Sequence, residues 1–152
     1  MKKLFLFIIC LTPALLCAKE LPTLDVVKQR LNGDKITTEN DWESMGNGIK
    51  QNIDKGILFV MPNSISIMYA LAGKNQNEVF LSSISANKLC ANALLSAIDM
   101  GQNKTLKNNM IETFIGALQS HNYTSVTMVW GYQYKVQLMD TKKGIIANCE
   151  IK

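Results

Sequence analysis

The C-terminal quarter of the chain alternates between hydrophobic and polar residues. In the stretch that starts at position 124, hydrophobic residues occupy every second position from 126 to 138, and Thr, Gly, Gln and Lys occupy most of the positions between them. A period of two residues is typical of a strand with one buried face. Residues 145–151 are rich in isoleucine and follow a turn-rich stretch at 140–144. The pattern therefore predicts a C-terminal antiparallel β-hairpin.

Earlier in the chain, hydrophobic residues recur three or four positions apart, which is the period of a helix buried on one side. Helices are expected over 23–32, from Asn40 or Asp41 through Ile53, over 64–72, from Ser83 or Ser85 to 100, and over 106–119. The second helix is interrupted by Gly46 and Gly48, which can split it into two turns. The last two are joined by a short turn after Gly101, which suggests an antiparallel helical hairpin.

An uncharged stretch over residues 56–73 has the length of a membrane-spanning helix. However, Pro62, Asn63, Ser64 and Ser66 lie inside it. Because a proline interrupts a helix, we expect a buried segment over 57–61, followed by a new helix that Asn63 caps. Packing in the core is therefore favoured over insertion into a membrane.

Together these elements predict an α+β fold. Helices in the N-terminal two-thirds of the chain are expected to pack on a C-terminal antiparallel β-hairpin or small sheet. A lone hairpin is only marginally stable in water. It must therefore lie against the helices or pair with another strand, for which residues 57–61 are a candidate.

The first eighteen residues have the organisation of an export signal. Lys2 and Lys3 form a basic start, an apolar core follows over 4–16, and Ala18 supplies a small residue for cleavage. We expect residues 1–18 to be removed and residues 19–152 to form a single globular domain in the periplasm or outside the cell. The alternative, a lipid anchor on Cys17, is disfavoured because the bulky Leu16 precedes it.

Removal of the signal makes the chain nearly neutral. The full sequence has 16 Lys and Arg against 12 Asp and Glu, and loss of two lysines leaves a net charge of about +2. The sequence contains no run of basic residues of the kind that neutralises nucleic-acid phosphates. Another protein is therefore a better candidate partner than a nucleic acid.

Two cysteines, Cys90 and Cys149, remain after cleavage. In an oxidising compartment they are expected to form a disulfide, which would stabilise the fold by about 4 kcal/mol. The alternatives are a reactive thiol, which needs a nearby base, and metal ligands, for which one histidine leaves too few donors. We therefore predict a disulfide and no metal site.

Residues suited to catalysis are scarce. The only histidine, His121, follows the expected end of a helix at 119, where it suits helix capping better than base catalysis. Asp41, Trp42 and Glu43 place carboxylates beside an aromatic ring, but adjacent helical residues point to different sides. Motifs of serine hydrolases, zinc proteases, phosphate loops and calcium loops do not occur. The sequence therefore predicts no enzyme and no cofactor.

An aromatic stripe on the predicted hairpin is the candidate partner-binding site. It consists of Trp130, Tyr132 and Tyr134. Aromatic residues on one face of a strand pack in the core more often than they bind a partner. On an edge strand, however, large aromatic residues also provide rigid contact area for a protein partner.

In its size, its predicted export and its lack of catalytic motifs, the chain resembles the periplasmic immunity proteins that protect bacteria from the cell-wall-degrading toxins of their neighbours. This resemblance transfers no residue role. It implies an exported protein-binding module that inhibits a toxin or a cell-wall hydrolase. The alternatives are an accessory or structural component of an envelope secretion or pilus system and, third, a small hydrolase.

Overall fold

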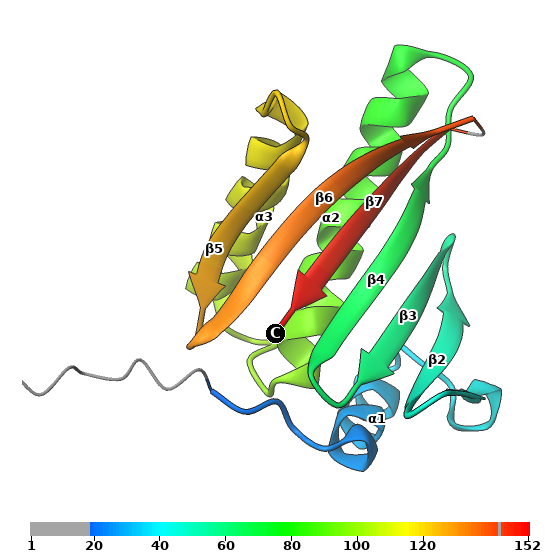
Figure 1. Ribbon diagram of the computed structural model, residues 1–152, viewed down its shortest axis with the longest axis vertical. Coiled ribbons are helices and arrows are strands. Elements are labelled where there is room, and N and C mark those ends of the chain that lie inside the picture. The colour runs from blue at the N-terminus through cyan, green and yellow to red at the C-terminus, as the bar shows by residue number, and fades with distance from the viewer. Residues whose placement is uncertain (1–18, 143) are drawn as a thin grey trace, which may run out of the picture.

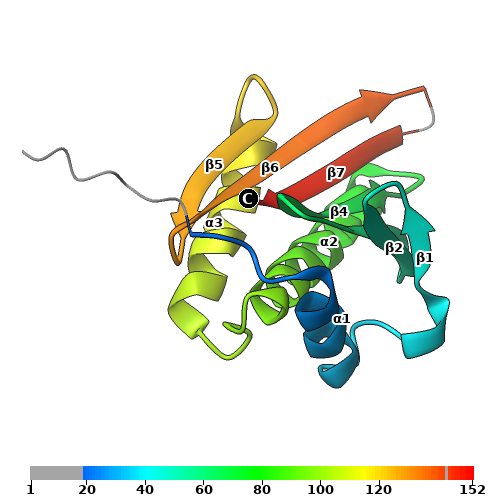
Figure 2. The ribbon, with the colours of Figure 1, turned by 60° about the horizontal axis from the view of Figure 1, so that its bottom comes forward.

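The computed structural model describes residues 19–142 and 144–152, in which one antiparallel sheet is covered on one face by three helices (Figures 1 and 2). The predicted signal, with Cys10 and Cys17, lies outside the described residues. The helices are α1 (Leu24–Gly33), α2 (Gln76–Ala97) and α3 (Lys104–Gln119). The strands are β1 (Glu43–Met45), β2 (Gly48–Ile53), β3 (Gly56–Met61), β4 (Ser64–Leu71), β5 (Thr124–Val129), β6 (Tyr132–Thr141) and β7 (Gly144–Ile151).

The seven strands lie in the order β1-β2-β3-β4-β7-β6-β5. The first four form one meander and the last three form another, and the two join where β4 pairs with β7. Inward-facing residues of both meanders pack against the helices in a single hydrophobic cluster. The core therefore lies between the sheet and the helices, and no described helix covers the opposite face of the sheet (Figure 2).

The predicted distribution of helices and strands is wrong, although the α+β class holds. The N-terminal part of the chain contributes four strands, three of which replace two expected helices, and the sheet is far larger than a hairpin. The helix expected from Asn40 or Asp41 through Ile53 is a short 3-10 turn, Glu39–Asp41, followed by β1 and β2. The helix expected over 64–72 is β4.

Tight turns explain this difference. Two residues connect β1 to β2 at 46–47, β2 to β3 at 54–55 and β3 to β4 at 62–63. Gly46 and Lys55 adopt φ values of 59° and 54°, which suit hairpin turns and do not continue a helix. In β4, the buried residues alternate as in a strand: Ile65, Ile67, Tyr69 and Leu71.

The strand expected over residues 57–61 is confirmed as β3. It pairs with β2 and β4, however, and does not contact the C-terminal hairpin directly. The uncharged stretch over 56–73 thus supplies two strands of the sheet. Across the described residues, no helix is both long and apolar enough to cross a membrane.

The helices predicted over 23–32 and 106–119 are confirmed as α1 and α3, but α2 is longer than expected. α1 begins one residue after its predicted start, and α3 begins two residues before. α2 starts at Gln76 and not at Ser83 or Ser85. Its cap is Asn75, whose side-chain oxygen accepts a hydrogen bond of 3.0 Å from the Glu78 backbone N–H.

The cap of α3 provides a test of the local fold. Asn103 Oδ1 accepts a hydrogen bond of 3.0 Å from the Leu106 backbone N–H, so Asn103→Ala is expected to lower the free energy of unfolding by about 1 kcal/mol. Thr105→Ala, at an exposed position of the first turn, should change it by less than about 0.5 kcal/mol. Urea denaturation measures both. Equal losses would show that Asn103 does not act as the cap.

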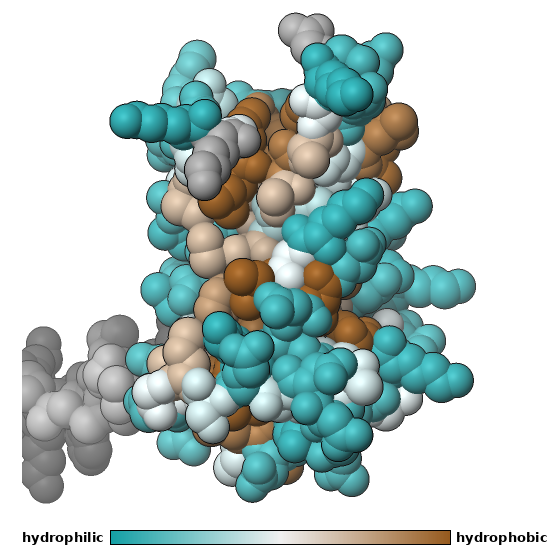
Figure 3. Space-filling view, turned by 90° about the vertical axis from the view of Figure 1, so that its right-hand side faces the viewer, coloured by the Kyte–Doolittle hydropathy of each residue, from teal (hydrophilic) through white to brown (hydrophobic). Residues whose placement is uncertain are grey.

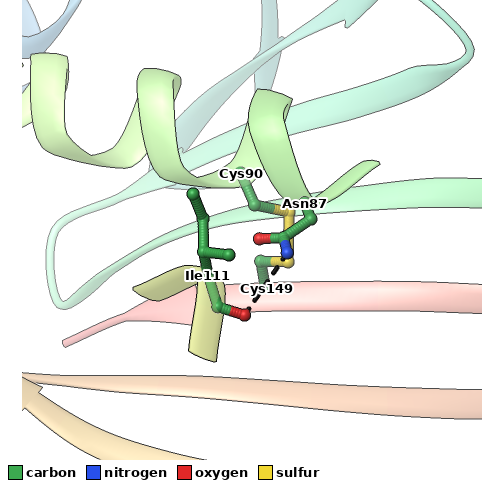
Figure 4. The surroundings of a disulfide bond; sticks show 4 residues. All are labelled: Asn87, Cys90, Ile111 and Cys149. Atoms are coloured by element: carbon green, nitrogen blue, oxygen red, sulfur yellow. Dashed lines mark hydrogen bonds between the residues drawn. A yellow bond between two sulfur atoms is a disulfide. The ribbon is translucent and has the colours of Figure 1, made fainter. Parts of the chain in front are cut away.

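A disulfide joins Cys90 of α2 to Cys149 of β7, as predicted (Figure 4). Both residues are fully buried, and their Cα atoms are 6.0 Å apart. Beside the bridge, the Asn87 side-chain amide donates a hydrogen bond of 3.3 Å to the Ile111 backbone carbonyl on α3. The two helices and the centre of the sheet are therefore connected at one place in the core.

Candidate partner-binding surfaces

The β5–β6 hairpin turns at Trp130 and Gly131. Val129 and Tyr132 lie directly opposite each other, and the two residues between them have φ values of 56° and 86°. Two successive positive φ angles are typical of tight β-hairpin turns. The single strand predicted over 124–138 is therefore wrong, because the turn splits it and changes which alternate residues face the helices.

The predicted aromatic stripe is divided between core and surface. Tyr132 and Tyr134 lie on the helix-covered face and are 2% and 0% exposed, whereas Trp130 at the turn is 49% exposed. Burial raises the pKa of the Tyr134 hydroxyl, because a buried phenolate would lose its hydration. Of the three candidate residues, only Trp130 presents substantial surface to a partner, and its role in binding stays a prediction.

Trp130 also has contacts within the chain. Lys19 Nζ lies 5.0 Å from the centre of the Trp130 ring and 5.4 Å from that of Tyr132, within the range of cation–π interactions. The Tyr132 hydroxyl donates a hydrogen bond of 3.0 Å to the Glu20 backbone carbonyl. Residues at the start of the described chain are therefore held against the β5–β6 turn.

A wider apolar surface lies between α2 and α3. The two helices approach each other near their connection and separate toward the N-terminal end of α2, at the top of Figure 1. A cavity of about 720 Å³ opens between the separated ends. We call this cavity the α2–α3 groove. It is lined by Gly73, Lys74, Asn75, Val79, Phe80, Ser83, Ile115, Leu118, Gln119 and Ile145.

Smaller cavities extend the α2–α3 groove. One of about 200 Å³ shares Phe80, Ile115 and Leu118 with it, and another of about 230 Å³ shares Leu118 and reaches Tyr123. Six of the eleven exposed large hydrophobic residues in the described part of the chain line these three cavities: Phe80, Ile84, Ile115, Leu118, Tyr123 and Ile145. The exposed apolar surface is thus concentrated at one end of the helical layer.

Comparison with known proteins does not assign this chain to a family. No protein-family model, curated protein or solved structure matches this chain. What the protein does must therefore be inferred from its own surfaces.

The α2–α3 groove does not follow from a helix that starts at Ser83 or Ser85, because Phe80 then lies outside the helix. With α2 starting at Gln76, Phe80 and Ile84 are four residues apart and share one side of the helix. The missed signal is Asn75 followed three residues later by Glu78, a spacing typical of a helix start. The Glu78 carboxylate also accepts a hydrogen bond of 2.7 Å from the Lys74 backbone N–H, which completes the cap.

Asp41, Trp42 and Glu43 line one pocket of about 390 Å³, which His121 does not line. His121 is exposed beyond the end of α3. Glu43 forms an ion pair of 3.0 Å with Lys50, and the Trp42 indole donates a hydrogen bond of 3.2 Å to Asn32. Over the ranges 19–142 and 144–152, no group of three or more His, Cys, Asp and Glu residues is placed to hold a metal ion. The contacts of Trp42 and Glu43 give both residues structural roles.

The uncovered face of the sheet is of mixed character. At the side of the molecule that borders this face along β2, hydrophobic residues gather in the upper half and hydrophilic residues cover most of the lower half (Figure 3). The strand register places Lys50, Glu150 and Lys135 in one row across this face, with Phe59 and Ser66 between them. Charged groups therefore cross the middle of this face.

Proposed function

We propose that this protein is an exported protein-binding module that recognises its partner through the α2–α3 groove. The more specific form of the proposal is an immunity-type inhibitor, which binds a toxin or a cell-wall hydrolase. Export rests on the predicted signal over residues 1–18. The proposal assigns no metal, cofactor or catalytic residue.

The observation that carries the proposal is the concentration of exposed apolar side chains around one concave site. Phe80 is 62% exposed at the mouth of a cavity of about 720 Å³. Large exposed apolar patches on soluble proteins commonly mark sites where another molecule binds. Aromatic residues beside a pocket are also the residue type that most often dominates the energy of protein–protein contacts.

The shape and charge of the α2–α3 groove favour an amphipathic helix or turn of a partner protein. Two helices form its walls, as in sites where a helix inserts apolar residues at intervals of three or four positions. Lys74 lines the groove and Lys88 lines the cavity of about 200 Å³ beside it, and both are exposed. The acidic Asp140 lines only the cavity that reaches Tyr123. We expect the partner segment to place acidic residues next to its apolar anchors.

A matched pair of variants tests the groove. Phe80→Asp is expected to raise the dissociation constant for the partner by about thirtyfold or more, because it places a charge where an apolar anchor binds. Leu81→Asp should change it by less than about threefold, since Leu81 is equally exposed but lines none of the three cavities. Calorimetry with purified wild-type partner, first recovered from the periplasm or from effectors of neighbouring species, measures both constants.

The outcome also separates the candidate functions. If the partner is a toxin, wild-type protein should protect cells from it, and the Phe80→Asp variant should not. If the partner is a component of a secretion or pilus system, the accessory role is favoured instead. Equal binding by the wild type and the Phe80→Asp variant would overturn the assignment of the groove.

A further inference from the structure

We propose that β5 is a dimerisation edge, at which two copies of this chain pair their β5 strands antiparallel across a two-fold axis and join two seven-stranded sheets into one. This surface is separate from the α2–α3 groove, so the inference does not depend on the proposed function. It rests on the contrast between the two edges of the sheet, on the free backbone of β5 and on the placement of its exposed apolar residues.

The two edges of the sheet differ in their protection against pairing. The β1 edge has three residues, and its Glu43 forms an ion pair of 3.0 Å with Lys50 of β2. β5 has six residues and no charge, and the sequence is uncharged from Asn122 to Tyr134. Native sheets usually block exposed edges by short strands, charges, prolines or bulges. β5 has none of the first three, which is expected of an edge that is covered by another strand.

The backbone of β5 has one side available. β5 pairs with β6 through all six of its residues, from Thr124 opposite Gln137 to Val129 opposite Tyr132. Within the described residues, no hydrogen bond outside this ladder engages the backbone of residues 125–129. The N–H and C=O groups on the other side of β5 are therefore available to a further strand.

Exposed apolar residues lie symmetrically along this edge. Tyr123, Val126, Met128 and Trp130 are between 49% and 57% exposed. In an antiparallel pair centred on Thr127, Val126 of each copy lies opposite Met128 of the other, and Thr124 lies opposite Trp130. Because directly opposite residues share a face of the sheet, both Val126–Met128 pairs form on the uncovered face, and both helical layers lie on the other.

The absence of charge favours a second copy over an unrelated strand. Two-fold pairing brings each residue near the centre of the strand close to the same residue of the other copy, so a charge there would lie near a like charge. Here the centre is Val126, Thr127 and Met128. The same symmetry brings Tyr123 of one copy close to Trp130 of the other, which places all four exposed residues in one interface.

Sedimentation equilibrium of the mature wild-type protein, residues 19–152, tests the proposal. We expect a dimer at concentrations of tens of micromolar. Val126→Lys should raise the dissociation constant by about tenfold or more, because it places two lysines close to the seam. Gln137→Lys adds the same charge to the uncovered face of β6, one strand from the seam, and should leave the dimer intact. Thermal unfolding checks that both variants are folded.

A crosslinking experiment tests the register. Under mild oxidation, a chain carrying Val126→Cys and Met128→Cys should form a disulfide-linked dimer, whereas Val126→Cys alone should form much less. A wild-type protein that stays monomeric at all concentrations up to about 1 mM would overturn the proposal, as would a dimer that Val126→Lys leaves unchanged. A monomer whose β5 pairs only with another protein would likewise refute self-association.

Discussion

Replacing Cys90 and Cys149 together by alanine is expected to lower the melting temperature by about 10–15 °C. The bridge closes a loop of 59 residues, and loss of this constraint on the unfolded chain corresponds to about 4 kcal/mol. Both residues are fully buried, so the alanines remain in the core without exposing a polar group. Differential scanning calorimetry of the oxidised wild type and the double variant measures the difference.

Chemical reduction is the control for this experiment. Treating the wild type with a reductant under unfolding conditions and refolding it in the reductant should lower its melting temperature by a similar amount. Cys149→Ser alone should lower it further, because it buries a hydroxyl and leaves a free thiol. A double variant within about 2 °C of the oxidised wild type would show that the bridge does not constrain the unfolded chain.

Phe114→Ala is expected to lower the free energy of unfolding by about 3–5 kcal/mol. Phe114 is fully buried on α3 and belongs to the core between the helices and the sheet. Its truncation removes apolar contacts and leaves a cavity beside the disulfide-linked helix. Guanidinium denaturation measures this loss. The slope of the free energy of unfolding against denaturant concentration should be the same for the wild type and the variant.

Phe80→Ala is the matched control, since it makes the same chemical change at an exposed site. Phe80 is 62% exposed, so its truncation should cost less than about 1 kcal/mol of stability. The pair thus separates a residue that holds the core together from one that is available for binding. Equal losses of stability would mean that Phe80 belongs to the core in solution, and the α2–α3 groove would then lose its main exposed aromatic residue.

Local patterns predicted some elements well. α1 and α3 have a clear helical spacing of apolar residues and polar residues at their ends, so they could be located to within two residues. The two cysteines allowed one pairing, and that pairing is present. The two helices depend on short stretches of sequence, and the disulfide was the only pairing that two cysteines allow.

The first meander was missed because its signals were assigned to the wrong structure. The buried residues of β4 alternate, but Met68 and Ala70 between them are also apolar, so the sequence of β4 has no clear period of two. Asn63 before β4 also resembles a helix cap, although residues 62–63 form the turn between β3 and β4. Gly46 fits the interruption of a helix as well as a turn, and with Asn47 it forms the hairpin turn between β1 and β2. Short apolar runs fit either period, and pairing with distant strands decides between them.

The binding surfaces were harder to predict than the fold. The alternation from Val126 to Leu138 continues through the β5–β6 turn, so nothing in its period marks Trp130 as a turn residue and Tyr134 as core. The α2–α3 groove depends on how two helices diverge, which their separate sequences do not specify. Surfaces of this kind arise from tertiary packing, and apolar residues that face a groove resemble those that face a core.

The last strand of the chain, β7, lies between β4 and β6 near the middle of the sheet. During synthesis, the two meanders therefore cannot join until residue 151 has emerged, and Cys149 cannot meet Cys90 earlier. Contacts between such distant segments form slowly, because a long stretch of chain must be ordered first. The sheet is therefore complete only when residues 144–151 have been synthesised, and until then the facing edges of β4 and β6 have no partner strand.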